Sequence, residues 1–176
     1  MDTVTALTAR LPDAAATKAL GAALAEQLQP GDVLALVGPL GAGKTTLVQG
    51  LADALDLPAG VPVQSPTFTV CNEYPTRVPL LHVDLYRLEG LDQAEDIGLD
   101  ERFADGRTLA VVEWADRVPE LIPSHALWVR LDHLDGSRRV TLAEGGGAAV
   151  TWARDLPGPA EGETWSETDG PMPWDS

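Results

Sequence analysis

The stretch GPLGAGKTT, Gly38 to Thr46, combines glycines, a lysine and two hydroxyl side chains at a spacing suited to binding phosphate. Gly38, Gly43, Lys44 and Thr45 match the pattern G-x-x-x-x-G-K-[ST]. In such a loop, glycines let backbone N–H groups converge on phosphate oxygens, the lysine reaches the β and γ phosphates, and the hydroxyl binds Mg²⁺. The stretch therefore predicts a site for a nucleoside triphosphate and its magnesium ion.

Two acidic side chains are candidates for holding the metal ion beside this loop. Asp84 closes the apolar run Leu80–Val83, and Glu113 closes the apolar run Leu109–Val112. Parallel strands bring their carboxyl ends together in the crevice where ligands bind, so both carboxylates are expected to face the phosphates. For either acid alone, the alternative is a solvent-exposed carboxylate at a strand end. The sequence leaves open which acid binds Mg²⁺ and which positions the attacking water.

The positions of the lysines indicate which base the nucleotide carries, because guanine recognition needs a lysine in a particular motif. A GTPase would need the guanine-binding motif Asn-Lys-x-Asp, and Lys18 and Lys44 are the only lysines of the chain. Neither stands in such a motif, so ATP is the expected nucleotide.

The elements that must position these residues follow from helix and strand signals. A helix is predicted over Asp13–Gln29, because Pro12-Asp13 is typical of a helix start and Pro30-Gly31 of a stop. The continuous apolar run Val33–Val37 predicts a strand buried on both faces, as in a parallel sheet. A second helix is predicted over Lys44–Leu55, directly after the phosphate loop.

The rest of the chain continues the alternation of helices and strands. Leu91–Phe103 is predicted to be helical at least in part. Leu127–Leu131 and Arg139–Leu142 alternate as in a hairpin, with its turn at Asp135-Gly136. Helices alternating with buried strands predict an α/β fold, with a central sheet that is mixed but mostly parallel. Residues 1–143 are expected to form this one domain.

Residues 144–176 are rich in glycine, proline and acids and show no usable period. This composition predicts a disordered acidic tail. Trp152, Trp165 and Trp174 are unusual in such a segment. They are either anchors for a partner or isolated aromatic side chains.

Composition limits the possible environments and partners. The net charge of −15 repels a phosphate backbone, which argues against this chain holding a nucleic acid by itself. The single cysteine, Cys71, excludes an internal disulfide framework. No apolar run approaches the length needed to span a bilayer, so no membrane association is expected. Since a single cysteine also fits a reducing compartment, the predicted location is the cytoplasm.

Five spaced blocks, in order GPLGAGKTT, QSPTF, HVDLYRL, EDIGLDE and VVEWADRVPELIP, resemble the bacterial TsaE family. The resemblance covers about residues 5–142. It implies a P-loop NTPase-type sandwich with a mixed sheet that binds ATP and Mg²⁺ and hydrolyses ATP slowly when alone. It also implies work with the TsaB and TsaD proteins, where TsaD transfers a threonylcarbamoyl group to adenosine 37 of tRNAs that read ANN codons. ATP would reset the TsaB–TsaD pair, and tRNA would be reached only through that complex.

The resemblance further implies roles for particular residues. The residues that would hold the phosphates are Gly41, Ala42, Gly43, Lys44, Thr45 and Thr46, beside Gly38. Lys44, Asp84 and Glu113 would be catalytic; Thr45 and Glu113 would bind Mg²⁺, with Asp84 beside the metal or its water.

Other positions are expected at the edges of the site. Ser65–Phe68 would form a switch-like loop near the γ phosphate. Trp114 would lie near the nucleotide or the partner surface, or would cap the edge of the sheet. Leu11, at the entrance to the first helix, and Arg138, in the last hairpin, would contact the adenine.

Two other classes of function remain open from the sequence. A small-molecule kinase on the same fold would need an acceptor pocket and usually a lid that carries arginines. Arg77, Arg87, Arg102 and Arg107 are available, but no arginine cluster marks a lid. A nucleotide-gated binding module, with incidental turnover, is the third hypothesis.

Overall fold

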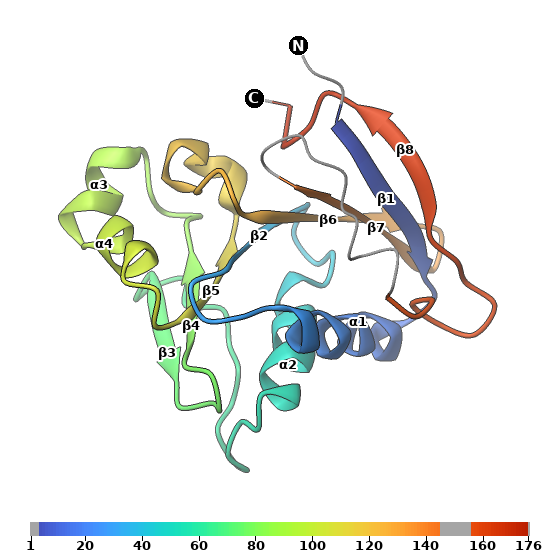
Figure 1. Cartoon of the computed structure of the whole chain (residues 1–176), viewed down its shortest axis with the longest axis horizontal. Helices are drawn as coiled ribbons and strands as arrows, with labels where there is room; N and C mark the ends of the chain where they lie inside the picture. Colours follow the sequence, from blue (N-terminus) through green and yellow to red (C-terminus); the bar gives the residue numbers. More distant parts are fainter. Residues whose placement is uncertain (1–3, 145–155, 176) are drawn as a thin grey trace.

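The computed structural model describes residues 4–144 and 156–175, which fold around one mixed sheet (Figure 1). The order of its eight strands is β3-β4-β5-β2-β6-β7-β1-β8. The strands are β1 (Val4–Leu11), β2 (Val33–Val37), β3 (Cys71–Tyr74), β4 (Leu80–Asp84), β5 (Leu109–Glu113), β6 (Leu127–Leu134), β7 (Ser137–Glu144) and β8 (Ser166–Gly170). The mixed α/β architecture expected from the sequence is confirmed.

The four inner strands β4, β5, β2 and β6 pair in parallel, whereas β3, β7, β1 and β8 pair antiparallel with their neighbours. The prediction of a mostly parallel sheet is therefore wrong, since only three of these seven pairings are parallel. It rested on the apolar runs, which mark only strands buried on both faces.

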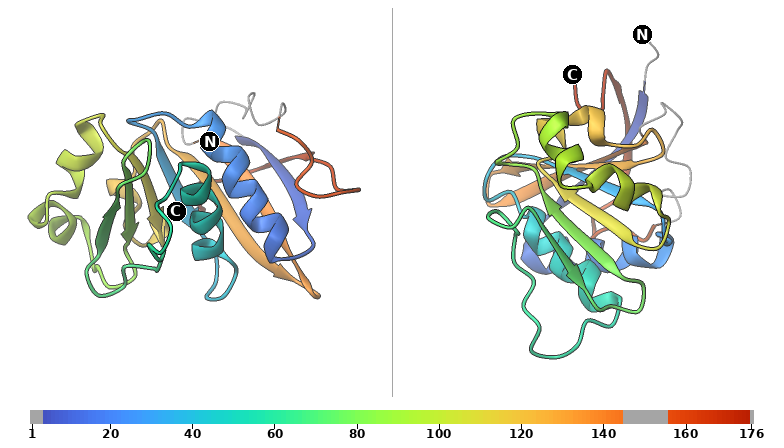
Figure 2. Two further views of the ribbon diagram at one scale, coloured as in Figure 1. Left: turned by 90° about the horizontal axis from the view of Figure 1, so that it is seen from below. Right: turned by 90° about the vertical axis from the view of Figure 1, so that its left-hand side faces the viewer.

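Helices cover both faces of the sheet (Figure 2). α1 (Ala14–Gln27) and α2 (Lys44–Ala54) pack on one face, and α3 (Leu91–Asp96) and α4 (Leu99–Ala104) pack on the other. Two short 3-10 turns follow β5, at Ala115–Arg117 and Pro119–Leu121. Among the described residues, no helix has both the length and the apolar character that crossing a membrane requires.

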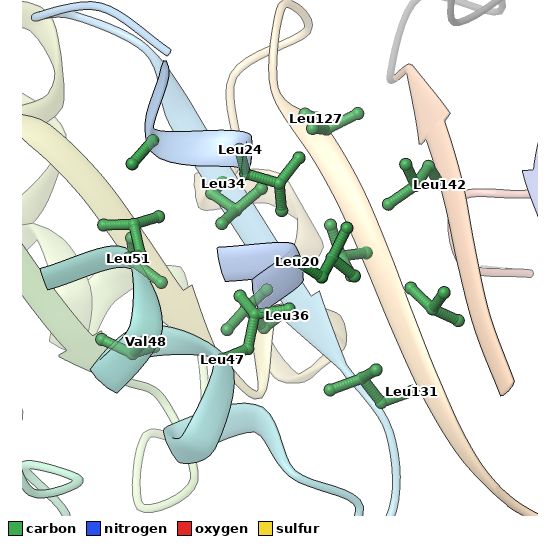
Figure 3. Close-up of a cluster of buried hydrophobic side chains, with 14 of the residues drawn as sticks. Leu20, Leu24, Leu34, Leu36, Leu47, Val48, Leu51, Leu127, Leu131 and Leu142 are labelled. Carbon is green, nitrogen blue, oxygen red and sulfur yellow. The ribbon is translucent and has the colours of Figure 1, made fainter. Parts of the chain in front are cut away.

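Alternating side chains of β2 build the two halves of the core. Leu34 and Leu36 point to the face of α1 and α2, where Leu20 and Leu51 meet them (Figure 3). Val33, Ala35 and Val37 point to the opposite face. Every residue of β2 is buried, as predicted for a strand covered on both sides.

The first helix begins where the sequence predicts. Asp13 caps it, because its Oδ1 accepts a hydrogen bond of 2.8 Å from the backbone N–H of Ala16. The helix ends at Gln27, two residues before the predicted end, since Leu28 already has an extended backbone. α2 begins at Lys44, so the glycine-rich loop (Gly38–Gly43) joins β2 directly to the N-terminus of this helix.

α1 and α2 approach each other through glycine. A Cβ at Gly50 would lie 2.1 Å from the carbonyl oxygen of Lys18, so only glycine fits this helix contact. We expect Gly50→Ala to lower the free energy of unfolding by about 3 kcal/mol, because the two backbones must separate. Gly90→Ala is the matched control, since Gly90 has an extended backbone with open space around it. Equal denaturation midpoints for both variants would contradict the close contact.

The prediction of a disordered tail is wrong for residues 156–175. β8 pairs antiparallel with β1, from Val4 opposite Gly170 to Thr8 opposite Ser166. Leu156 is buried in the core cluster that includes residues of α1 and α2. β8 could not be predicted, because strand pairing uses backbone groups, which the polar segment SETDG supplies as well as an apolar one.

Two of the three tail tryptophans contact the domain. Trp165 packs against the core on the α1 side, and the ring of Trp174 lies 6.1 Å from that of Trp128. They are thus not isolated aromatic side chains in a mobile tail. Trp152 lies outside the described residues.

Candidate functional site

The glycine-rich loop turns the chain from β2 into α2. Gly38, Gly41 and Gly43 have φ values of 141°, 76° and 106°, which side chains with a Cβ rarely adopt. At Gly38 a Cβ would also lie 2.2 Å from the carbonyl oxygen of Leu131, so the loop runs directly against β6. The backbone N–H groups at the start of α2 lie at the end of this turn, an arrangement that favours anions.

Lys44 lies under this loop with its ammonium group held in place. Its Nζ donates hydrogen bonds to the carbonyl oxygens of Gly38 (2.6 Å) and Pro39 (3.0 Å) and lies 4.3 Å from the ring centre of Trp114. Burial lowers the pKa of Lys44, an effect that the nearby Glu113 carboxylate partly opposes. A phosphate oxygen is an alternative acceptor for these donors, and it would bring the negative charge that a buried ammonium favours.

The two predicted acids lie side by side. Asp84 and Glu113 are opposite each other in the parallel pairing of β4 and β5. Both are buried, so neither is a solvent-exposed carboxylate at a strand end. The hydroxyl of Thr45 donates a hydrogen bond of 3.0 Å to Oε1 of Glu113, which ties α2 to the sheet at the end of the loop.

Asp84 is held by a different set of donors. Its Oδ2 accepts hydrogen bonds from the hydroxyls of Ser65 (2.5 Å) and Thr67 (3.3 Å), and its Oδ1 accepts one from the backbone N–H of Tyr86 (2.9 Å). The segment predicted to act as a switch-like loop therefore bonds directly to one of the two acids. A movement of this loop would change the donors around Asp84.

One cavity of about 450 Å³ brings these residues together. The residues that line it are Leu40, Gly41, Gly43, Lys44, Thr45, Thr46, Ser65, Thr67, Asp84, Tyr86, Glu113 and Trp114. It thus contains the predicted lysine, the predicted hydroxyl and both predicted acids. Leu40 and Tyr86 were not predicted to line the site. Tyr86 lies two residues after Asp84 in the block HVDLYRL, and this closeness to a predicted acid could have indicated it.

A second cavity of about 210 Å³ adjoins the loop. It shares Gly41, Gly43 and Thr46 with the first, and it is lined by Leu11 and Arg138. Arg138 donates hydrogen bonds of 3.1 Å to the carbonyl oxygens of Gly41 and Ala42. The two positions expected near the adenine therefore lie together beside the glycine-rich loop, although they are far apart in the sequence.

Trp114 takes a strained backbone conformation at the end of β5, with φ 56° and ψ 40°. Its ring lies 5.0 Å from the ring of Tyr86 and under the ammonium of Lys44. β5 is an inner strand, so Trp114 does not cap the edge of the sheet. Phe68 of the switch-like segment is 82% exposed, and the Arg87 guanidinium lies 4.3 Å from its ring centre.

The oxygen donors of this site fit Mg²⁺ rather than a softer metal. Thr45, Glu113 and Asp84 offer a hydroxyl and two carboxylates. Within the described ranges there is no group of three or more His, Cys, Asp or Glu side chains that could hold a metal alone. Mg²⁺ suits such a site, because it commonly takes one or two carboxylates and completes its shell with phosphate oxygens and water.

Comparison with known proteins places this chain in a family. The family model "Threonylcarbamoyl adenosine biosynthesis protein TsaE" matches residues 11–141. The chain belongs to the TsaE family. The matched region contains the glycine-rich loop, both acids, Leu11 and Arg138, whereas β8 lies beyond it.

Similar proteins include two named tRNA threonylcarbamoyladenosine biosynthesis protein TsaE. The one from Bacillus subtilis is 44% identical over 128 residues, which is 72% of this chain and 78% of the relative. The one from Streptomyces coelicolor is 40% identical over 143 residues, which is 76% of this chain and 92% of the relative. The crystal structure of Bacillus subtilis YdiB superposes with a TM-score of 0.72 at 35% identity, covering 87% of this chain and 95% of that one. TsaE membership thus has sequence and structural support.

Proposed function

We propose that this chain is a P-loop ATP hydrolase that serves the threonylcarbamoyladenosine modification of adenosine 37 in ANN-decoding tRNAs, together with TsaB and TsaD. The observation that carries the ATPase proposal is the contact between Thr45 and Glu113 beside the buried Lys44, in one cavity at the start of α2. The names of the TsaE relatives support the tRNA process.

In this proposal each residue of the main cavity has a defined task. The loop N–H groups and Lys44 bind the β and γ phosphates, and Thr45 and Glu113 hold Mg²⁺, which when bound neutralises charge on the phosphates. Asp84 orients a water whose oxygen attacks the γ phosphorus. The bond to the β–γ bridging oxygen breaks with its electron pair going to ADP, the proton of the water passes to the phosphate product, and ADP and phosphate leave. The smaller cavity beside Leu11 and Arg138 receives the adenine end.

The charge of the chain fits an indirect role at tRNA. The net charge of −15 repels a phosphate backbone, so the chain is a poor candidate to hold tRNA by itself. TsaB and TsaD, rather than this chain, would therefore hold the tRNA.

The proposal is tested by measuring the ATP hydrolysis rate with and without purified TsaB and TsaD. We expect slow hydrolysis by the chain alone and a changed rate in the mixture. If the hydrolysis rate is the same with and without TsaB and TsaD, and phosphate is transferred from ATP to a small metabolite, the kinase alternative would be supported instead.

The acids are tested by substitution. We expect Glu113→Ala and Asp84→Ala each to lower the hydrolysis rate by about 10²-fold or more, while the ADP affinity measured in EDTA changes much less. The reason is that both carboxylates act at the metal or the water rather than on the nucleotide itself. Asp100→Ala is the matched control, because Asp100 is an exposed acid on α4. Hydrolysis at the unmodified rate in either acid variant would remove that residue from the proposed mechanism.

A further inference from the structure

A fully buried histidine lies behind Glu113, and the proposed hydrolysis gives it no task. His82 occupies the middle of β4 with 0% of its surface exposed. Its Nε2 lies 2.5 Å from Oε2 of Glu113. Side chains alternate along a strand, so His82 shares the face of Asp84, which is the face that α2 covers.

The other ring nitrogen indicates how this contact is made. Nδ1 of His82 is buried and finds no hydrogen-bond partner within the part of the chain that the structure describes. An ionised carboxylate only accepts hydrogen bonds, so the contact with Oε2 of Glu113 requires a proton on Nε2, and the partnerless Nδ1 can then carry the lone pair. The ring proton is therefore on Nε2, and His82 donates it to Glu113.

Each oxygen of the Glu113 carboxylate thus has its own donor. Oε1 accepts from the hydroxyl of Thr45 and Oε2 accepts from His82. The two donors come from different elements, α2 and β4; His82 and Glu113 are buried, whereas Thr45 is half-buried and lines the cavity. Because Oε2 is taken by the histidine, Oε1 is the oxygen that faces Thr45 and the cavity.

We propose that His82 is a positioning residue, which fixes the rotation of the Glu113 carboxylate so that Oε1 is presented to Mg²⁺ beside Thr45. This inference rests on the proposed function, because it requires the nucleotide and its metal at this site. His82 itself touches neither of them. Its effect is confined to the Mg²⁺-dependent part of nucleotide binding and to hydrolysis.

The test compares His82→Leu with His82→Gln. Leucine approximates the volume of the ring without a donor, whereas the glutamine amide N–H₂ reaches about as far as Nε2. ADP affinity is measured by calorimetry with Mg²⁺ and with EDTA. For His82→Leu we expect the affinity in EDTA to be unchanged and the gain from Mg²⁺ to fall by about 10-fold or more, the usual effect of removing a partner of a metal ligand. His82→Gln should regain most of that loss.

Three results would overturn the inference. They are a full Mg²⁺ effect in His82→Leu, an equal loss in both variants, and failure of both variants to fold as judged by circular dichroism, which would make His82 only structural. Failure of the proposed function is distinguishable, because the unmodified protein would then bind no ADP or would bind it without any Mg²⁺ effect.

Discussion

Replacing Lys44 with alanine is expected to lower the rate of ATP hydrolysis by about 10²- to 10³-fold, the range found when a single preorganised donor to a developing charge is removed. Lys44 is buried beneath the glycine-rich loop and points its donors at the loop carbonyls. The expected site of the β and γ phosphates would lose its one ammonium group. The measurement is steady-state hydrolysis, with nucleotide affinity measured separately.

Two further variants separate charge from position. Lys18→Ala removes the other lysine of the chain, which is exposed on α1, and should leave the rate unchanged. Lys44→Arg keeps the charge but replaces a compact ammonium with a planar fork, so we expect it to remain strongly impaired. If Lys44→Ala hydrolyses ATP as fast as Lys18→Ala, the glycine-rich loop is not the phosphate site.

Removal of residues 145–176 is expected to destabilise the domain. Leu156 is buried in the main core, and burial of a leucine alone contributes about 2 kcal/mol. The truncation also removes β8, so the side of β1 that faces away from β7 loses its partner strand. Such an exposed strand edge favours self-association. At about 2–4 °C for each kcal/mol in a chain of this size, the Tm should fall by about 5 °C or more.

Point substitutions show whether packing causes this effect. Leu156→Ala should lower the Tm in the same direction by removing buried contacts, whereas Glu161→Ala, an exposed acid of the same segment, should not. The ion pair between Arg10 and Glu163 is half exposed and should contribute little. A truncated protein with an unchanged Tm would show that the segment does not stabilise the domain.

The site residues could be predicted where they are neighbours in the sequence or stand at the ends of recognisable strands. The residues from Gly38 to Thr46 form a loop and the first turn of α2 without a break in the chain, so their spacing alone indicated that they lie together. Asp84 and Glu113 could be paired because each closes an apolar run, and ends of parallel strands meet. His82 could not be assigned, because a histidine within a strand gives no sign of which neighbour it faces.

Helices and strands could be predicted where the sequence pattern of apolar and capping side chains indicates which residues are buried and where an element begins. The run Val33–Val37 indicated a strand covered on both faces, and Asp13 marked a helix start through its capping group. β1 and β8 gave no such sign. β8 is mostly polar and pairs through its backbone, and its partner lies at the opposite end of the chain.

The sequence by itself determined the glycine-rich loop, the two acids, the inner strands and the family. These features depend on local backbone preference, on side-chain chemistry and on periodic burial, all of which act between near neighbours along the chain. The tertiary structure decided which oxygen of Glu113 faces Thr45, that Leu11 and Arg138 share one cavity, and that the tail completes the sheet. Those arrangements depend on contacts between residues far apart in the sequence, which arise only when the chain closes on itself.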